Sequence, residues 1–535
     1  MQITKDVRPN LNSNPAWPWA GGLFGLALII RLVYALQLTF PPLDDPAYYI
    51  QGARSFFNGR PLELAIIWNY HPAPATVLHP GFDFWMPLTS FLIALSFLFL
   101  GDTPLAAQLP GVLAGASLPV LTFWLARRAF ASLDISVRFK LYMAGAAGLY
   151  IAINPLLAYQ SAVPDSQMIY AALVAAAVLV WTGRESPANC FWLGILLGLA
   201  YLTRSHAAFL VLAWSIVTLG RLIKEPEYRP QAFKLAAFTM LGAGLVAGPW
   251  LLRNWFTFGY FSSPAALESA LIYNYATLFN YETPINFSTL ASLGLENILQ
   301  ARLVALYNAW FEVLGTMFLP AVILPGAGLY LLWRHEPGQV GRWVLYSLLL
   351  GLGLPLIFVA ASSTGSFYHS SGSMAAFGAI GYIFLLYRAG EQYRKFRPKG
   401  IHFFPVLLTT LLALVIIQFS VSLNGTIGTH RHDQAVYARL NTWLADNNVS
   451  GPLISDEPSS LNYATGRPAL RLPSDEPLEV VERLAKRYGA EYIIITGYFG
   501  RYPTLLQAPG NTIFRLVHQD SRGEFEVYKV PGSSG

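Results

Sequence analysis

The chain has 535 residues, of which 54% are hydrophobic and only 12% are charged. Soluble domains carry about 25% charged residues, so this composition excludes an ordinary soluble protein and indicates a chain that lies largely in a membrane. The formal net charge of +6 does not indicate a nucleic-acid partner, because most Lys and Arg lie in short loops between apolar runs, as they do in membrane proteins.

Apolar runs near the length needed to cross a bilayer recur from Trp17 to Leu423. Lys5 and Arg8 precede the first run, which is too long for a signal peptide and has no small-residue cleavage site after it. We therefore expect a retained first helix with a cytoplasmic N-terminus. The expected helices are 17–39, 84–100, 104–127, 140–160, 166–183, 190–204, 206–222, 234–257, 303–333, 343–361, 371–388 and 402–422.

Twelve crossings would place most of the basic loops outside, against the positive-inside rule. Omitting the run at 84–100 returns all of them to the inside, and this run is short, contains Pro87 and is followed only by Gly101-Asp102-Thr103. We therefore expect about eleven crossings, with 84–100 as a juxtamembrane or re-entrant segment at the outer interface. The segments then expected outside are 40–103, 161–165, 258–302, 362–370 and everything after Asn424.

The tail carries more charge than the rest and contains the short β-like runs PLISD, YIIIT and FEVYKV between helical stretches near 431–446 and 477–489. This pattern predicts a small α/β domain. The expected organisation is an all-α membrane domain at 1–423, with its first outer loop at 40–103, and an extracytoplasmic α/β domain at 424–535. Because the tail has no glycine-rich phosphate loop and no metal-ligand spacing, a structural or acceptor-docking role is favoured over catalysis.

Three acidic residues open expected outer helices. Asp44 and Asp45 directly follow the first helix, and Asp165 follows a proline at a later helix entrance. Asp45 and Asp165 could each be a simple helix cap. Two adjacent carboxylates, with Tyr48 four residues after the first, exceed what capping requires, and a carboxylate held at a membrane interface can act as general base toward an acceptor hydroxyl or amine.

Three arginines lie at or near the outer ends of expected helices: Arg204, Arg253 and, deeper in the first helix, Arg31. A structural arginine that reaches the interface explains one such residue. Arginine also binds phosphate through a planar, bidentate fork that stays charged. For Arg31, a buried ion pair with Glu312, expected at similar depth, is the alternative to phosphate contact.

His71, His79 and Asp83 lie together in the first outer loop. They could ligate a divalent metal, but their spacing is irregular and no further histidine cluster supports a site. No metal ligand is therefore assigned from the sequence, and no cofactor is certain.

In this order and spacing the chain resembles the GT-C superfamily of integral-membrane glycosyltransferases, specifically the bacterial branch related to protein O-mannosyltransferases and the lipid A aminoarabinose transferase. The resemblance covers roughly residues 20–390. It rests on the acidic pair followed by Tyr48, on HPGFDFWMPLTSFLIALSFLFLG as the juxtamembrane element, on AQLPGVLAGASLPVLTFWLARRAF as the next helix, and on VPDS, GLAYLTRS and PWLLRNWFTFG.

The resemblance bears on nine of the candidate site residues, and Arg31 is a candidate from its position in the first helix. The resemblance makes Asp44 the candidate base, with Asp45 and Asp165 as further candidate catalytic carboxylates. The sequence departs from the family pattern at two places. One is His79, where a lysine is common before the proline, and the other is Phe367-Tyr368-His369, where many members have Arg-Tyr. The remaining candidates are Arg204, Arg253 and Arg31 for the donor phosphate, and Tyr48, His79, Tyr368 and His369 for the substrate pocket.

The function implied is inverting transfer of a sugar from a polyprenyl-phosphate donor to a lipid, glycan or protein acceptor at the extracytoplasmic face of a bacterial plasma membrane. The competing interpretations are a lipid or sugar-lipid flippase and a non-catalytic membrane assembly protein. The clustered outer acids, the outer domain and the lack of a visible internal repeat speak against a flippase.

Overall fold

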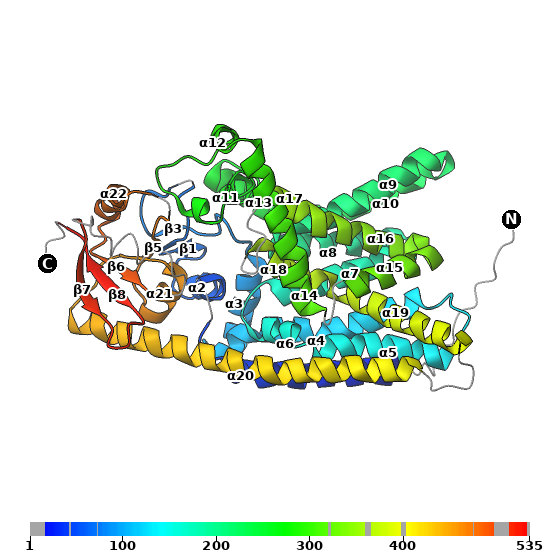
Figure 1. The fold of residues 1–535 in the computed structure, drawn as a ribbon. Coiled ribbons are helices and arrows are strands. Elements are labelled where there is room, and N and C mark those ends of the chain that lie inside the picture. The colour runs from blue at the N-terminus through cyan, green and yellow to red at the C-terminus, as the bar shows by residue number, and fades with distance from the viewer. Residues whose placement is uncertain are drawn as a thin grey trace.

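A computed structural model describes residues 16–531 except 42–43, 72, 319–322, 359–364, 397–402, 475 and 497–512. Lys5 and Arg8 lie outside the described residues. Figure 1 shows a helical bundle at one end of the molecule and a cap of sheet and short helices at the other, with helix α20 running along both.

Within the described residues, seven helical runs are long and apolar enough to cross a membrane, and the pair α5 (Val137–Ile153) and α6 (Pro155–Ala162), bent by 54°, would make an eighth. Two shorter apolar helices, α7 (Gln167–Trp181) and α8 (Pro187–Thr203), pack among them. The predicted polytopic helical fold is confirmed, and the eleven crossings stay a prediction. The seven runs are α1 (Ala16–Ala35), α4 (Pro104–Ala129), η2 with α9 (Ser205–Ala207, Ala208–Lys224), η3 with α10 (Pro226–Tyr228, Arg229–Phe258), α16 with η6 and α17 (Pro337–Leu348, Leu349–Gly353, Leu354–Ile357), α18 with η7 and α19 (Ser366–Ser371, Gly372–Met374, Ala375–Phe396), and α20 (Phe403–Asp446).

Small residues let the bundle helices approach closely, as is common between membrane helices. A Cβ at Gly194 of α8 would lie 2.0 Å from the carbonyl oxygen of Thr239 in α10, and one at Gly242 would lie 2.3 Å from that of Phe191. Each helix therefore needs glycine where its backbone meets the other.

The run at 84–100 forms α3 (Leu88–Leu100), a helix of 13 residues that ends at Gly101 with a positive φ of 73°. At a rise of about 1.5 Å per residue it is roughly 20 Å long, too short for a hydrocarbon core of about 30 Å. The Thr103 hydroxyl then caps α4 by accepting from the amide of Ala106. These features agree with the expected juxtamembrane segment.

The expected single helix at 303–333 is instead several pieces. It starts earlier, at α13 (Leu295–Tyr307), continues through the wider turn η5 (Asn308–Val313) and α14 (Leu314–Met317), and resumes at α15 (Ile323–His335). Pro325 lies in the first turn of α15, where a helix tolerates proline.

The cap contains a six-stranded sheet in the order β2-β5-β4-β6-β8-β7. Its first strand, β2 (Ile66–Ile67), comes from the first loop and pairs in parallel with β5 (Ala469–Arg471). The runs PLISD, YIIIT and FEVYKV form β4 (Leu453–Ser455), β6 (Tyr492–Ile495) and β8 (Glu526–Lys529), as predicted. The other cap elements are α2 (Asp44–Ser55), β1 (Glu63–Leu64), β3 (His79–Pro80), α11 (Pro264–Glu268), η4 (Ala276–Phe279), α12 (Phe287–Ser292), α21 (Pro458–Thr465), α22 (Leu478–Tyr488) and β7 (Arg515–Gln519).

The 44-residue helix α20 joins the two parts without a break. The predicted helical stretch at 431–446 is its distal half, and the predicted domain boundary at 423/424 falls inside it. Because β2 also crosses into the C-terminal sheet, the first loop and the tail build one cap together.

Candidate active site

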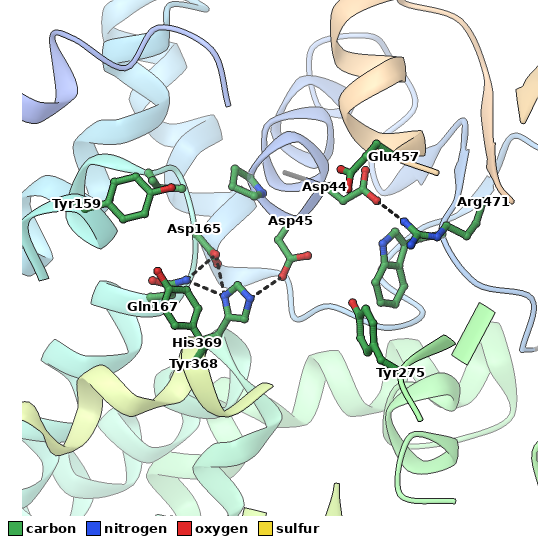
Figure 2. A pocket seen from close by; sticks show the side chains of 13 residues that line it. Asp44, Asp45, Tyr159, Asp165, Gln167, Tyr275, Tyr368, His369, Glu457 and Arg471 are labelled. Atoms are coloured by element: carbon green, nitrogen blue, oxygen red, sulfur yellow. Dashed lines mark hydrogen bonds and ion pairs between the residues drawn. The ribbon is translucent and has the colours of Figure 1, made fainter. Parts of the chain in front are cut away.

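A pocket lies where the cap meets the bundle, between α2, the α6–α7 turn, α18 and the tail (Figure 2). Five parts of the chain that are far apart in sequence contribute to it. Its lining is Asp44, Asp45, Pro46, Trp68, Tyr159, Val163, Asp165, Gln167, Tyr275, Tyr368, His369, Glu457 and Arg471.

The centre of the pocket is a chain of three polar side chains, Asp45, His369 and Asp165. His369 Nε2 lies 3.6 Å from Asp45 Oδ2, and His369 Nδ1 lies 3.0 Å from Asp165 Oδ2. Asp165 and His369 are buried. The imidazole therefore bridges two carboxylates that are 120 residues apart in sequence, an arrangement in which one acid orients the ring toward the other.

Asp165 is held firmly as a carboxylate. Its Oδ1 accepts from the backbone amide of Ser166 and, at 2.8 Å, from the Ser166 hydroxyl, and its Oδ2 accepts from Gln167 at 3.2 Å. Burial alone would raise the pKa of Asp165, but His369, Arg204 and the Ser166 hydrogen bond outweigh it and lower the pKa to about 2. Asp165 is therefore ionised at any physiological pH.

Asp44 is fixed from the cap side. Its Oδ1 accepts from the backbone amides of Ser459 (2.8 Å) and Ser460 (3.2 Å), in the first turn of α21, and its Oδ2 accepts from Arg471 Nη1 at 3.0 Å. A carboxylate at the N-terminus of a helix satisfies amides that have no partner within that helix. Burial raises the pKa of Asp44 to about 6, although Arg471 and the two amides act in the opposite direction.

Asp45 has fewer partners. Burial raises its pKa, and the nearby His369 lowers it in part. Both carboxylates of the acidic pair therefore line the pocket, but Asp44 faces Arg471 and α21 whereas Asp45 faces His369 and Asp165 (Figure 2).

Arg204, at the end of α8, lies beside this chain. Its Nη1 donates to the Ser166 hydroxyl at 2.6 Å, the same hydroxyl that donates to Asp165. Its Nε is buried and has no hydrogen-bond partner among the described residues. Arg204 also lines an adjacent hollow whose other walls are largely apolar or hydroxyl-bearing: Tyr49, Phe84, Trp85, Met86, Thr203, Ser205, His206, Ala266, Ser269, Phe358 and Ser366.

Arg253, Tyr48 and His79 lie outside the lining of the pocket. Arg253 donates to the carbonyl of Gly81 at 2.8 Å and lies over the rings of Trp250 and Phe258. The Tyr48 hydroxyl accepts from the amide of Phe82 at 2.7 Å. These contacts hold α2 and the 79–86 segment against α10.

His79 pairs with Asp83 at 3.7 Å and its Nδ1 lies 2.9 Å from the Val77 carbonyl oxygen. Burial lowers the pKa of His79, but the contact with Asp83 outweighs it and the net shift is upward. His71 lies instead 3.7 Å from Glu268. The trio considered from the sequence as metal ligands does not form a ligand group within the described part of the chain.

Arg31 is fully buried in the bundle. It donates to the Ser161 hydroxyl at 3.1 Å and to the carbonyls of Ala152 and Ala27 at 3.0 and 3.2 Å. Glu312 is exposed, so the expected Arg31–Glu312 ion pair is wrong. The expected pairing failed because the side chain of Glu312 lies on an exposed face of η5.

One group of described residues has the geometry to hold a metal ion: ligand atoms from Asp45, Asp165 and His369 lie within 4.8 Å of one another. Carboxylate oxygen and imidazole nitrogen suit zinc and related divalent ions. In the described geometry the two nitrogens of His369 face different carboxylates, and one ring offers only one nitrogen to a given ion. A bound ion would therefore replace the bridging arrangement by one imidazole nitrogen and two carboxylate oxygens.

Sequence reasoning missed several lining or neighbouring residues, namely Trp68, Gln167, Tyr275, Glu457 and Arg471 in the pocket and Tyr49 beside it. Tyr49 had a usable signal, because it follows Asp45 by four residues and so shares its helix face. Glu457 and Arg471 had none, since their place depends on how the tail pairs with the first loop.

Neither a protein-family model nor a curated protein matches the sequence. Solved structures do match the fold. ArnT from Cupriavidus metallidurans bound to undecaprenyl phosphate aligns with 97% of this chain and 99% of its own, at 13% identity and a TM-score of 0.58. In the apo state it aligns with 98% and 100%, at 12% identity and a TM-score of 0.55.

The Archaeoglobus fulgidus oligosaccharyltransferase, in complex with zinc and sulfate, aligns with 92% of this chain and 70% of its own, at 12% identity and a TM-score of 0.58. ArnT and the oligosaccharyltransferase are both GT-C enzymes. The chain therefore has the fold of the GT-C integral-membrane glycosyltransferases, as its sequence resemblance predicted.

Proposed function

We propose that this protein transfers a sugar from a polyprenyl-phosphate donor to an acceptor at the membrane face that carries the cap. The observation that carries the proposal is the buried Asp45–His369–Asp165 chain at the junction of bundle and cap, with Arg204 one hydrogen bond away. We assign the cap to the extracytoplasmic side of a bacterial plasma membrane. The acceptor is a lipid, a glycan or a protein.

The reaction needs a base for the acceptor and cationic groups for the leaving phosphate. The acceptor oxygen or nitrogen bonds to the anomeric carbon while the bond from that carbon to the phosphate oxygen breaks, and its electron pair leaves on the phosphate. The base takes the acceptor proton. A single displacement of this kind inverts the anomeric configuration.

Asp45 is better placed than Asp44 to be the base. Both oxygens of Asp44 already accept from Arg471 or from α21, whereas Asp45 has the bridging imidazole at 3.6 Å and a hydrogen bond from Trp85. A carboxylate whose pKa is raised by burial is also the stronger base. Asp44 then keeps the acidic pair in position, and Asp165 orients His369.

Arg204 suits the donor phosphate. Its buried Nε has no partner within the described chain, and a guanidinium with one edge fixed on Ser166 can offer the rest of its fork to a phosphate oxygen. The apolar side chains of the adjacent hollow, such as Trp85, Met86 and Phe358, are suited to the isoprenoid chain. Arg253 is a second candidate, nearer the 79–86 segment.

The test is sugar transfer by the full-length protein in detergent, from the polyprenyl lipid that co-purifies with it and is identified by mass spectrometry. Asp45→Asn should lower the rate on the order of 10²-fold or more, with a melting temperature no lower than that of the parent, because burial already disfavours the ionised carboxylate. Asp102→Asn is the matched control, because Asp102 pairs with Arg54 away from the pocket. Near-normal turnover of Asp45→Asn would remove Asp45 from the base role.

The detergent assay, together with a lipid-transport assay in vesicles, separates the transferase from a flippase and from an assembly protein. In detergent no membrane barrier exists, so a flippase has nothing to transport. A parent protein that moves the lipid between leaflets of vesicles but transfers no sugar would be a flippase, and one that does neither would be an assembly protein.

A further inference from the structure

A second hollow, of about 390 Å³, lies between the distal half of α20 and the tail. Its walls combine carboxyl and hydroxyl groups with a few apolar side chains. We call it the α20 hollow, and its lining is Phe40, Thr429, His432, Asp433, Val436, Tyr437, Glu457, Ser460, Thr496, Gly523 and Glu524.

The α20 hollow adjoins the candidate active site. Glu457 lines both spaces. Ser460 connects them as well, because its amide donates to Asp44 at 3.2 Å and its hydroxyl lies 3.5 Å from Glu457 Oε2. The first turn of α21 is therefore the partition between the α20 hollow and the acidic pair.

The α20 hollow and Arg204 reach the reacting groups through different neighbours, Glu457 for the hollow and Ser166 for Arg204. Figure 2 shows Asp165 and His369 on one side of Asp45, and Glu457 and Arg471 on the other. Arg204 contacts Ser166, next to Asp165. A displacement at carbon requires the nucleophile and the leaving group on opposite faces of that carbon. An acceptor that enters past Glu457 would meet a donor whose phosphate rests on Arg204 with this geometry.

The walls of the α20 hollow mainly accept hydrogen bonds. Asp433, Glu457 and Glu524 supply carboxyl groups, and the nearest cations are already engaged: Arg439 pairs with Asp520 and Glu524, and His432 lies 3.7 Å from Glu524. Such walls suit ligand hydroxyl or ammonium groups. They disfavour a phosphate, because like charges placed together in an interface cost free energy.

We infer that the α20 hollow is the acceptor site of the proposed transferase, and that it takes a sugar unit which presents hydroxyl or ammonium groups and carries no phosphate beside its reacting group. The inference rests on the proposed function. The volume of the α20 hollow, about 390 Å³, agrees with this assignment, since small-molecule pockets span about 300–1,000 Å³. The pocket at the acidic pair has only about 70 Å³.

The test narrows the α20 hollow without touching the acidic pair. Thr429→Trp places a large side chain at an exposed position of α20 that lines the hollow. Ala438→Trp is the control, because Ala438 is also exposed on α20 but lies outside the lining. The acceptor probes are methyl glucoside, methyl glucosaminide and glucose 6-phosphate. Their binding to the full-length protein is measured by ligand-observed NMR. Transfer to the tightest probe is compared with release of the donor sugar to water.

We expect Thr429→Trp to lower the ratio of transfer to hydrolysis at least tenfold, and Ala438→Trp to keep the parental ratio. Glucose 6-phosphate should bind at least tenfold more weakly than methyl glucoside. Asp433→Asn, which keeps the shape of the side chain, should weaken binding of methyl glucosaminide severalfold and provides a second variant if the tryptophan impairs folding.

The outcomes separate this inference from the proposed function. A parent that transfers sugar, with an unchanged ratio in Thr429→Trp, contradicts the acceptor site and leaves the transferase intact. Equal or tighter binding of glucose 6-phosphate contradicts the assigned ligand chemistry. A parent that neither transfers nor hydrolyses the donor contradicts the proposed function, and the acceptor assignment falls with it.

Discussion

Arg471 Nη1 donates to Asp44 Oδ2 at 3.0 Å, although the two residues are 427 positions apart in the sequence. Arg471 ends strand β5, whose partner β2 belongs to the same loop as Asp44. The guanidinium also lies 3.8 Å from the ring centroid of Phe279. The tail thus does more than cover the bundle, because it holds the acidic pair at the mouth of the site.

The first prediction concerns this ion pair and pH. The charge of Arg471 lowers the pKa of Asp44, which burial raises to about 6. Because Asp44 keeps the acidic pair in position only when it is ionised and accepts from Arg471 and α21, Arg471→Met should move the acid limb of kcat/KM upward by about 1 unit or more, the usual effect of one nearby charge. Arg471→Lys keeps the charge and should leave the limb close to that of the parent.

Arg467→Met is the control, because Arg467 contacts Asn441 and the carbonyl of Val449 rather than the pocket. The profile is measured as initial rates from pH 4.5 to 8. A parental acid limb in Arg471→Met would show that ionisation of Asp44 does not limit the reaction.

Much of the fold was predictable because it depends on the hydropathy of residues that are close together in the sequence. The length of the apolar runs predicted the bundle helices, and the shortness of 84–100 predicted α3 as a juxtamembrane segment. Short β-like runs in the tail predicted β4, β6 and β8. The broken helix after Met317 was not predicted, because hydropathy alone does not show where a continuous apolar run bends.

The part of the candidate site that belongs to the bundle and the first loop was predictable, whereas the part that belongs to the tail was not. Asp45 and Asp165 lie at or near the start of a helix, and His369 lies in a short helix. All three are at the same end of the bundle, so the order of the helices alone places them near one another. Arg471 and Glu457 could not be placed, since the register of β2 against β5 decides which tail residues face the acidic pair. The pairing of Arg31 with Glu312 was also wrong, because the sequence does not show which face of a helix Glu312 occupies.

The second prediction is a pH-dependent stability. The pKa of Asp44 is about 6 in the folded protein against an ordinary value of 3.8, so the folded state binds this proton more tightly. The stabilisation is then complete below about pH 4 and is lost as the pH rises through about 6. Asp165, whose pKa is lowered to about 2, contributes in the opposite sense and only below about pH 4.

Asp44→Asn should therefore flatten the fall in melting temperature between pH 4 and pH 6, without abolishing it, because burial also raises the pKa of Asp45. The measurement is thermal unfolding in detergent across that range. Asp102→Asn should keep the parental slope. An unchanged slope in Asp44→Asn would mean that Asp44 is not buried in the folded protein.

The third prediction concerns a divalent ion. If Asp45, Asp165 and His369 hold one, chelation should lower both activity and melting temperature, and a divalent salt should restore both. His369→Ala should then lower the metal content measured by elemental analysis. His71→Ala should not, because His71 contacts Glu268 and the Asn280 carbonyl instead. Full activity after exhaustive chelation, with no metal in the protein, would contradict the site.

The fourth prediction is the topology. Residues 101–103 and the tail from 425 onward should lie on one side of the membrane and residues 388–400 on the other. In a Cys190→Ala background, since Cys190 is the single cysteine, cysteines placed at Gly101, Thr103 and Gly523 should react from the extracytoplasmic side, and one at Arg388 only after permeabilisation. Labelling of position 101 from the cytoplasm alone would end the juxtamembrane interpretation of α3.

The last prediction separates Arg204 from Arg253 as the residue that binds the donor phosphate. Lysine keeps the charge of arginine but loses the planar, bidentate fork. Arg204 has one fork edge fixed on Ser166 and a buried Nε with no partner in the described chain, so Arg204→Lys should raise the donor KM and lower the rate on the order of tenfold or more. The Arg253 guanidinium lies 4.8 Å from the ring centroids of Trp250 and of Phe258, and its Nη2 donates to the Gly81 carbonyl. Arg253→Lys should therefore act mainly through stability, with a lowered melting temperature and a nearly parental donor KM. Both variants are assayed over a range of donor concentrations in detergent, with the acceptor saturating. A parental donor KM in Arg204→Lys, together with a raised one in Arg253→Lys, would assign the binding of the donor phosphate to Arg253, beside the 79–86 segment.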